Sequence, residues 1–238
     1  MTAVATPTRR STDQLRALAA DGAALVGDAP ADEVVAWAAR TFPGTLAVAS
    51  SMETGVLPHL VSQHAPGVDV LFLDTGYHFA ETLGARAEVE HSLDVTVVDV
   101  RPRLSVAEQD ARHGPRLHDR DPEACCRMRK IEPLREALTG YECWMSGLRR
   151  DESPDRAGTP TVTFDETNGI VKVNPLAAWA SDDVLGYGLR HRVPVNLLLS
   201  DEYPSIGCAP CTARVAPGAD RRSGRWAGRD KTECGIHQ

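Results

Sequence analysis

Apolar residues along this chain fall into two patterns: some recur at helical spacing, and others form short, mostly apolar segments. Helical spacing predicts helices from Ser11 to a break at 28–30, from Ala31 to Thr41, up to about His64, through His91 and over 181–191. The unbroken apolar run at 46–49 is typical of a strand covered on both sides, and the segments 68–73 and 95–100 predict two further strands. Repeated β–α–β units of this length predict an α/β fold with a mostly parallel sheet and helices on both faces.

The second half of the chain adds one more strand, a hairpin and a helix. Residues 141–146 predict the strand, and 161–164 with 170–173 predict a hairpin around an Asn-Gly turn. Asp121 and Pro122 are suited to open a helix, because proline is well tolerated at the first helical position. This helix would carry the pair Cys125-Cys126.

Three polar segments follow predicted strands directly. They are residues 50–54, 73–76 and 147–154. In parallel sheets, ligands bind beyond the carboxyl ends of the strands, so we expect these segments to line a common site.

The overall composition is that of an ordinary globular protein, and only the C-terminal part of the chain departs from it. The 238 residues are 42% hydrophobic and carry a net charge of −7, which argues against a general nucleic-acid or membrane-surface binder. We expect a disordered N-terminus at 1–10, one α/β domain at 11–212 and a mobile tail at 213–238. The tail is basic and suggests a local anionic ligand. Residues 214–231 contain two acidic residues, Asp220 and Asp230, against Arg214, Arg221, Arg222, Arg225, Arg229 and Lys231.

Nothing in the sequence predicts export or membrane insertion. No apolar run is long enough to span a bilayer, and residues 1–10 lack the apolar core of a secretion signal. Six cysteines without an export signal indicate a reducing compartment, where cysteine usually means metal binding or catalysis. We therefore expect a cytoplasmic protein.

Four of the six cysteines form two close pairs, Cys125-Cys126 and Cys208-x-x-Cys211. The second pair alone could be a chelating arm or a redox pair. Adjacent cysteines on a helix diverge by about 100°, so they reach one centre only if it is broad or the backbone bends. Four thiolates match the ligand set of a [4Fe–4S] cluster. A zinc ion and unrelated thiols are the alternatives that the residues leave open.

The two remaining cysteines differ in their surroundings. Cys143 lies inside an apolar strand and is predicted to be a core residue. Cys234 has neither a nearby partner nor a core position, and it lies between Glu233 and His237 near the C-terminus. A thiol is nucleophilic as the thiolate, which the nearby cations Lys231 and His237 would favour and Glu233 would oppose. An unpaired thiol on a frayed tail is the alternative.

Basic residues accompany these features. Lys130 lies four residues after Cys126 on the same helix face, Arg149 follows a strand, and Arg222 and Arg225 precede Cys234. Guanidinium groups match the oxygens of phosphate and sulfate, and lysine adds a point charge. Any one of them could be a solvated surface charge, but together they predict a site for a strongly anionic substrate.

The combination resembles the phosphoadenylyl-sulfate (PAPS) reductase family, in particular its iron–sulfur bacterial branch, the assimilatory adenylyl-sulfate (APS) reductases. The resemblance covers roughly residues 45–237. It rests on Cys125-Cys126 with Arg129-Lys130, Leu73-Asp74-Thr75-Gly76, Gly147–Ser153, Cys208-Ala209-Pro210-Cys211-Thr212, Arg222-Ser223-Gly224-Arg225-Trp226 and Lys231–His237. The paired cysteines and the terminal Glu-Cys-Gly-Ile-His are its most specific parts.

The resemblance implies an adenine-nucleotide alpha hydrolase-like fold and thioredoxin-dependent reduction of adenylyl sulfate to sulfite and AMP, within sulfate assimilation. The turn at 50–53 lacks the glycines of a pyrophosphate loop, which argues against ATP hydrolysis. Cys234 would form an S-sulfocysteine, and a thioredoxin-like dithiol would release the sulfite. The implied cofactor is a [4Fe–4S] cluster, and a homo-oligomer is compatible with the family.

The same resemblance assigns the other site residues. The cluster ligands would be Cys125, Cys126, Cys208 and Cys211. The substrate-binding residues would be Ser50, Leu73, Lys130, Gly147, Arg149, Arg222, Arg225 and His237. Arg156 is displaced by one position from a family arginine, so the resemblance assigns it no role. The alternatives are the 3′-phosphorylated substrate, a non-redox ATP-using enzyme of the pyrophosphate-loop kind, and a zinc-stabilised nucleotide-binding module.

Overall fold

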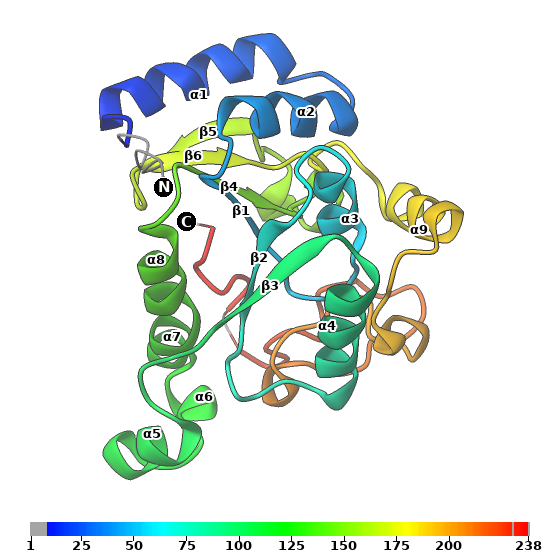
Figure 1. Ribbon diagram of the computed structural model, residues 1–238. Helices are drawn as coiled ribbons and strands as arrows, with labels where there is room; N and C mark the ends of the chain where they lie inside the picture. Colours follow the sequence, from blue (N-terminus) through cyan, green and yellow to red (C-terminus); the bar gives the residue numbers. More distant parts are fainter. Residues whose placement is uncertain (1–8, 230, 238) are drawn as a thin grey trace.

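The computed structural model describes residues 9–229 and 231–237. Its centre is a six-stranded sheet with strand order β3-β2-β1-β4-β6-β5 (Figure 1). The strands are β1 (Leu46–Ala49), β2 (Val68–Leu73), β3 (Val95–Val100), β4 (Cys143–Ser146), β5 (Val162–Asp165) and β6 (Ile170–Val173). Neighbouring strands run parallel, except that β5 is antiparallel to β6. The predicted mostly parallel sheet is confirmed.

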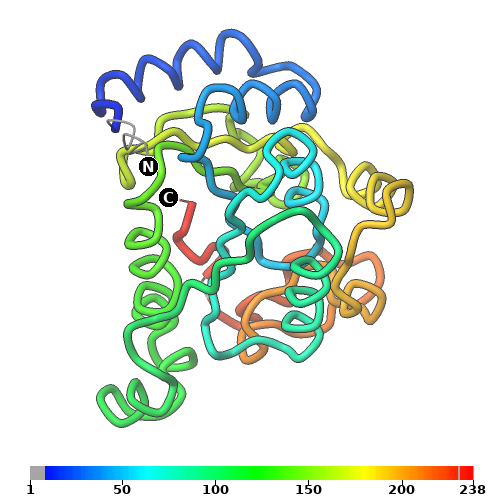
Figure 2. The backbone as a smooth tube through the Cα atoms, viewed as in Figure 1, coloured from blue at the N-terminus to red at the C-terminus, as the bar shows by residue number. Residues whose placement is uncertain are grey.

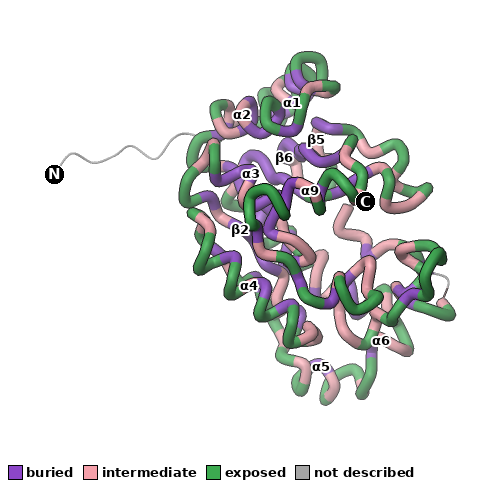
Figure 3. Tube along the Cα trace, turned by 90° about the vertical axis from the view of Figure 1, so that its right-hand side faces the viewer, coloured by how far each residue is buried: buried purple, intermediate pink, exposed green. Residues whose placement is uncertain are grey.

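Helices cover both faces of this sheet. The α-helices are α1 (Thr12–Val26), α2 (Ala31–Thr41), α3 (Val56–Ser62), α4 (Ala80–Ser92), α5 (Val106–His113), α6 (Leu117–Arg120), α7 (Pro122–Cys126), α8 (Glu132–Leu138) and α9 (Ser181–His191). In Figure 1, α3 and α4 lie on one side of β2 and β3, and α8 lies on the other. In Figure 3 the purple that marks buried residues is concentrated in the middle of the molecule. Val48 of β1, Val70 of β2 and Trp144 of β4 are fully buried. Burial of these central strands explains the unbroken apolar run at 46–49.

The helix predicted from Asp121 is interrupted. Between α7 and α8 the backbone forms one π-helical turn, η1 (Arg127–Ile131). Pro133 has no backbone N–H and cannot donate to the carbonyl of Arg129, which favours the wider turn. The cysteine pair at the end of α7 therefore lies immediately before the π-helical turn.

The C-terminal tail has no long helix or strand in its described part, yet it packs against the body. Figure 2 shows it, in red, entering the space beside α7 and α8. Ile236 packs against the main core, and Cys234 contacts a second small cluster with Cys126 and Trp226. These contacts place residues 231–237 over the carboxyl edge of the sheet.

The predicted disordered N-terminus lies largely outside the described residues, which begin at Arg9. Arg9 and Arg10, which we had included in it, are instead held to the body. Arg9 donates to the carbonyls of Thr139 and Tyr141, and Arg10 forms an ion pair with Glu142. Among the residues that the structure describes, no helix is both long and apolar enough to cross a membrane.

Candidate active site

A cavity of about 200 Å³ opens at the carboxyl edge of the sheet, between β1 and β4. The chain winds from β1 towards β2 on one side and towards β4 on the other, so this is the position where open α/β sheets bind ligands. Ser50, Leu73 and Gly147 all line it, each from a segment that follows or ends a strand. The three segments predicted to share a site are therefore brought together.

The turn after β1 has a strained backbone. Met52 is buried and has φ 58°, a left-handed conformation that non-glycine residues seldom adopt. The Ser50 hydroxyl accepts a hydrogen bond from the Met52 backbone N–H at 3.2 Å. The Glu53 carboxylate accepts one from the Ile206 N–H at 3.1 Å, and burial raises the pKa of Glu53 above its usual value. This turn fixes the floor of the cavity without the glycines of a phosphate loop.

The four predicted cations, Lys130, Arg149, Arg222 and Arg225, all line the cavity, but they are not equivalent. Arg149 is 8% exposed in its side chain and donates to Asp151 at 3.1 Å, with Glu152 at 3.5 Å. Its charge is therefore already compensated. Among the described residues Arg225 forms no salt bridge, and it donates to the neutral oxygens of Ser205 and Ile206. Arg225 thus lacks the directly paired carboxylate that Arg149 has.

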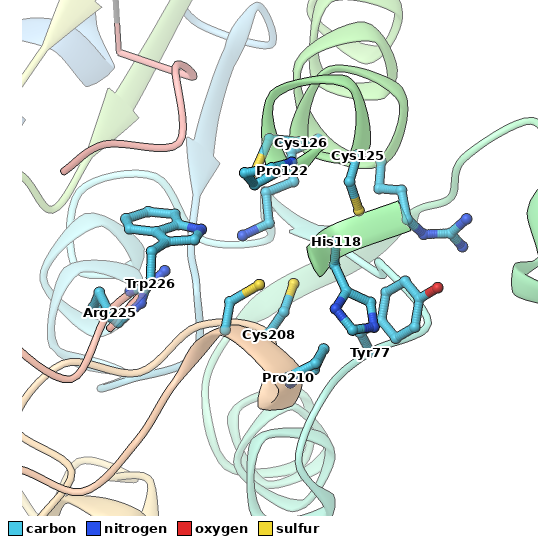
Figure 4. A pocket seen from close by; sticks show the side chains of 12 residues that line it. Tyr77, His118, Pro122, Cys125, Cys126, Cys208, Pro210, Arg225 and Trp226 are labelled. Atoms are coloured by element: carbon cyan, nitrogen blue, oxygen red, sulfur yellow. The ribbon is translucent and has the colours of Figure 1, made fainter. Parts of the chain in front are cut away.

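Beside this cavity the four paired cysteines line a second, much smaller one of about 10 Å³. Figure 4 shows Cys125 and Cys126 on the helix and Cys208 on the loop opposite, with His118 and Trp226 at the sides. Within the described residues all six cysteines are free of disulfides. In the same part of the chain, no three His, Cys, Asp or Glu side chains converge on the position of a single metal ion.

The cysteines in this small cavity disfavour one another's ionisation, because neighbouring thiolates would repel. Burial, followed by repulsion from Cys126, Cys208 and Cys211, raises the pKa of Cys125 to about 12. Cys208 differs, because the Lys130 ammonium and the Thr75 hydroxyl outweigh its burial and lower its pKa. Four thiols gathered here without a disulfide match the donor set of an iron–sulfur cluster.

Lys130 lies on the π turn and lines both cavities. Its neighbour Arg129 anchors the turn, donating to the Thr75 carbonyl at 2.5 Å and to Gln109 at 3.0 Å. Burial would lower the pKa of Lys130, but the facing Cys208 and Cys234 outweigh it and raise that pKa. The π turn therefore places one ammonium between the cysteine pairs and the larger cavity.

The tail brings Cys234 to this same point. Cys234 is 9% exposed, lines the larger cavity and packs against Cys126. Cys143, by contrast, is fully buried in β4, and burial raises its pKa well above the usual value. His237 also lines the cavity, but burial and the nearby Lys172 lower its pKa well below the usual range. His237 is therefore neutral and is not the cation beside the thiol that we had expected.

The residue before the thiol holds the tail in place. Glu233 receives two hydrogen bonds from Arg156, from Nε and Nη2, each at 2.7 Å, and Arg222 Nη2 lies 3.2 Å away. The three side chains are only 12–16% exposed. From the sequence, Arg156 has no assigned role and Glu233 is expected to oppose the thiolate. The pairing was not readable from sequence, because 77 residues separate the two partners.

Replacing Glu233 by glutamine should expose the thiol. The variant loses the charge that two guanidinium groups share, and buried charge-assisted hydrogen bonds are the strongest of their kind. We expect alkylation of Cys234 by iodoacetamide to become about tenfold faster, equivalent to about 1.4 kcal/mol for opening the tail. Peptide mass spectrometry of the alkylated protein over time measures this rate.

Glu166→Gln is the matched control, since Glu166 pairs with Arg16 on the exposed surface. It should leave the alkylation of Cys234 unchanged. Equal rates for Glu233→Gln and the unaltered protein would show that the Arg156 pair does not hold the tail.

Comparisons with known proteins agree with this geometry. Residues 45–214 match the model of the phosphoadenosine phosphosulfate reductase domain. The chain is 56% identical over 228 residues to the adenosine 5'-phosphosulfate reductase of Streptomyces coelicolor, covering 96% of this chain and 97% of the relative. It is 52% identical over 237 residues to that of Mycolicibacterium smegmatis, covering 100% of this chain and 99% of the relative.

Solved structures give the same result. The phosphoadenylyl-sulfate reductase of Candida auris superposes with a TM-score of 0.68 at 25% identity, covering 88% of this chain and 100% of that one. The Candida glabrata FMN adenylyltransferase, at 10% identity and a TM-score of 0.55, covers 89% of this chain and 69% of its own and shares the fold alone. By the matching domain and these identities, the chain belongs to the phosphoadenosine phosphosulfate reductase family.

Proposed function

We propose that this enzyme reduces adenylyl sulfate to sulfite and AMP, with Cys234 as the nucleophile. One observation carries the proposal: the buried Cys234 lies in the same cavity as Lys130, Arg222 and Arg225, at the carboxyl edge of the sheet. A thiol among cations suits attack on an anionic sulfuryl group. The relatives named above, at 52–56% identity, carry the name of this activity.

In the first step the Cys234 thiolate attacks the sulfur of the substrate's sulfate group. The bond between that sulfur and the bridging phosphate oxygen breaks, AMP leaves with the electron pair, and an S-sulfocysteine forms. Lys130 and Arg225 offset the charge that develops on the transferring and leaving oxygens. Ser50, Leu73 and Gly147 would hold the nucleotide, since they line the cavity at the strand ends.

In the second step a thioredoxin-like dithiol acts as reductant. One of its thiolates attacks the Cys234 sulfur, sulfite leaves, and the second thiol resolves the mixed disulfide. The dithiol supplies the two electrons that take the sulfur from sulfate to sulfite. Because Cys234 is only 9% exposed in the docked tail, this step requires residues 231–237 to swing out of the cavity.

Cys125, Cys126, Cys208 and Cys211 would hold a [4Fe–4S] cluster, which fits four thiols, two buried and two partly buried, from two facing segments. When bound, the cluster would fix α7 and the 208–211 loop and tune the local field, and the two steps above need no electron from it. Lys130, which lines both cavities, is the residue through which that field reaches the substrate.

The choice between adenylyl sulfate and PAPS depends on whether Arg149 is free to bind a phosphate. A 3′-phosphate on the ribose needs a free cation near Gly147. Arg149 is already paired with Asp151, and Arg150 donates to the Thr159 carbonyl instead of lining the cavity. We therefore expect kcat/KM for adenylyl sulfate to exceed that for PAPS by at least about 100-fold, a loss of about 2.7 kcal/mol for the unpaired phosphate.

The measurement is sulfite release from each nucleotide by anaerobically purified protein with a thioredoxin system. Asp151→Asn serves as the informative variant, because it removes the charge of the nearer of the two carboxylates beside Arg149 and should reduce the preference for adenylyl sulfate over PAPS. Equal or faster turnover of PAPS by the unaltered protein would replace the proposed substrate by its 3′-phosphorylated form. Release of pyrophosphate from ATP, with no sulfite from either nucleotide, would favour the adenylating alternative.

A further inference from the structure

Lys172 is a buried lysine that the proposed mechanism does not use. It lies on β6, directly opposite Trp144 of β4 in the sheet register, so both side chains project from the same face. The Lys172 ammonium lies 4.8 Å from the centre of the Trp144 ring and 3.4 Å from Nδ1 of His237. The His237 ring is parallel to that of Trp144, at 6° and 5.9 Å between centres. The sheet and the tail thus meet at these three side chains.

The hydrogen bond between Lys172 and His237 has only one direction. An ammonium group donates and never accepts, so Nδ1 must be the accepting nitrogen and carries no proton. Burial and the cations Lys172, Arg156 and Arg222 keep the ring neutral, since they lower the pKa of His237 well below its usual value. In a neutral imidazole the single proton then resides on Nε2.

The charges around Lys172 are compatible with this arrangement. Burial lowers the pKa of Lys172, Asp165 of β5 raises it and Arg156 lowers it, so that the pKa lies at about 8. The Asp165 carboxylate is itself held by the indole N–H of Trp144 at 2.9 Å. At pH 7 most molecules therefore retain the Lys172 ammonium.

The second ring nitrogen is free for substrate. Within the described residues no group hydrogen-bonds Nε2, and His237 lines the cavity that also contains Cys234 and Arg222. We propose that Lys172 is a positioning residue that locks His237 as the Nε2–H tautomer, so that His237 donates a hydrogen bond to the phosphosulfate group. This role rests on the proposed function for its kinetic part, whereas the tautomer itself is a property of the free protein.

The direct test is nitrogen-15 NMR of the histidine rings at pH 7, on anaerobically prepared full-length protein without substrate. The His237 signals are assigned by their loss in His237→Asn. We expect Nδ1 to be unprotonated and Nε2 protonated in the unaltered protein and in Lys172→Arg. In Lys172→Met the preference should be lost. A His237 ring that is protonated on Nδ1, or on both nitrogens, in the unaltered protein would overturn the inference, whatever the enzyme catalyses.

Kinetics supply the second readout. Lys172→Met should lower kcat with adenylyl sulfate about tenfold or more. The KM for the thioredoxin partner should change much less. Lys172→Arg should retain most of the kcat of the unaltered protein. Circular dichroism and AMP binding confirm that the methionine variant is folded. If Lys172→Met keeps both the tautomer and kcat, Lys172 only packs under Trp144. If no variant turns over adenylyl sulfate but the NMR result holds, the proposed function fails and the Lys172–His237 arrangement stands.

Discussion

Cys234→Ser should release no sulfite from adenylyl sulfate, even with an excess of the dithiol reductant. A serine hydroxyl near neutral pH is a far poorer nucleophile than a thiolate, and the substitution changes one atom in a tail that Glu233 still holds to Arg156. We expect a loss of at least about 10³-fold, within the range that removal of a covalent nucleophile produces. Nucleotide binding should remain, because Ser50, Leu73 and Gly147 lie on the sheet edge and not on the tail.

The unaltered protein supplies the positive half of this test. With adenylyl sulfate and no reductant it should release up to one AMP per active site and then stop. The stalled enzyme should carry an adduct of about 80 Da on Cys234, as the covalent step demands. Added thioredoxin should remove that mass as sulfite. An adduct on the fully buried Cys143, or turnover by Cys234→Ser, would show that the tail thiol is not the nucleophile.

The sheet was predictable because its strands are short, mostly apolar segments, and the central strands β1, β4 and β6 are buried almost throughout. Strands β2 and β3 begin and end at the residues expected from sequence, 68–73 and 95–100. The expected strand at 141–146 begins two residues later, at Cys143, because Tyr141 still closes the turn after α8. The π turn was not foreseen, since a break in a helix depends on one missing N–H at Pro133 and leaves no mark on apolar spacing.

The site was predictable where it depends on residue type and strand ends. Every site residue named from sequence lines one of two adjoining cavities. What sequence could not supply were pairings between distant segments: Glu233 with Arg156, and Lys172 with His237. It also could not separate Arg149, which forms an ion pair with Asp151, from Arg225, which forms none among the described residues. Which charged side chains pair with each other depends on the burial and geometry of the folded chain, and neighbouring residues in the sequence do not reveal it.

Removal of one proposed cluster ligand should abolish cluster binding and strongly reduce turnover. The protein should be brown when purified without oxygen, with a broad absorbance near about 400 nm and about four iron and four sulfide per chain. Cys126→Ala should be colourless, since three thiolates cannot complete the ligand set, and should lose at least about 100-fold in kcat. Cys126 packs against Cys234 and lines the small cavity, so its loss also removes one contact of the tail.

Cys143→Ala is the matched control, because it removes a thiol of the same chemistry from the core strand β4 instead of the small cavity. It should keep colour, iron and turnover, at a cost in stability of about 1–2 kcal/mol for the lost sulfur contacts. Iron and acid-labile sulfide analysis, absorbance and sulfite release on each variant measure the outcome. A colourless unaltered protein that holds one zinc ion and no sulfide, even when made without oxygen, would replace the cluster by a zinc site. A Cys143→Ala variant that alone loses iron would move the ligand set to β4, where the sulfur is fully buried in the core.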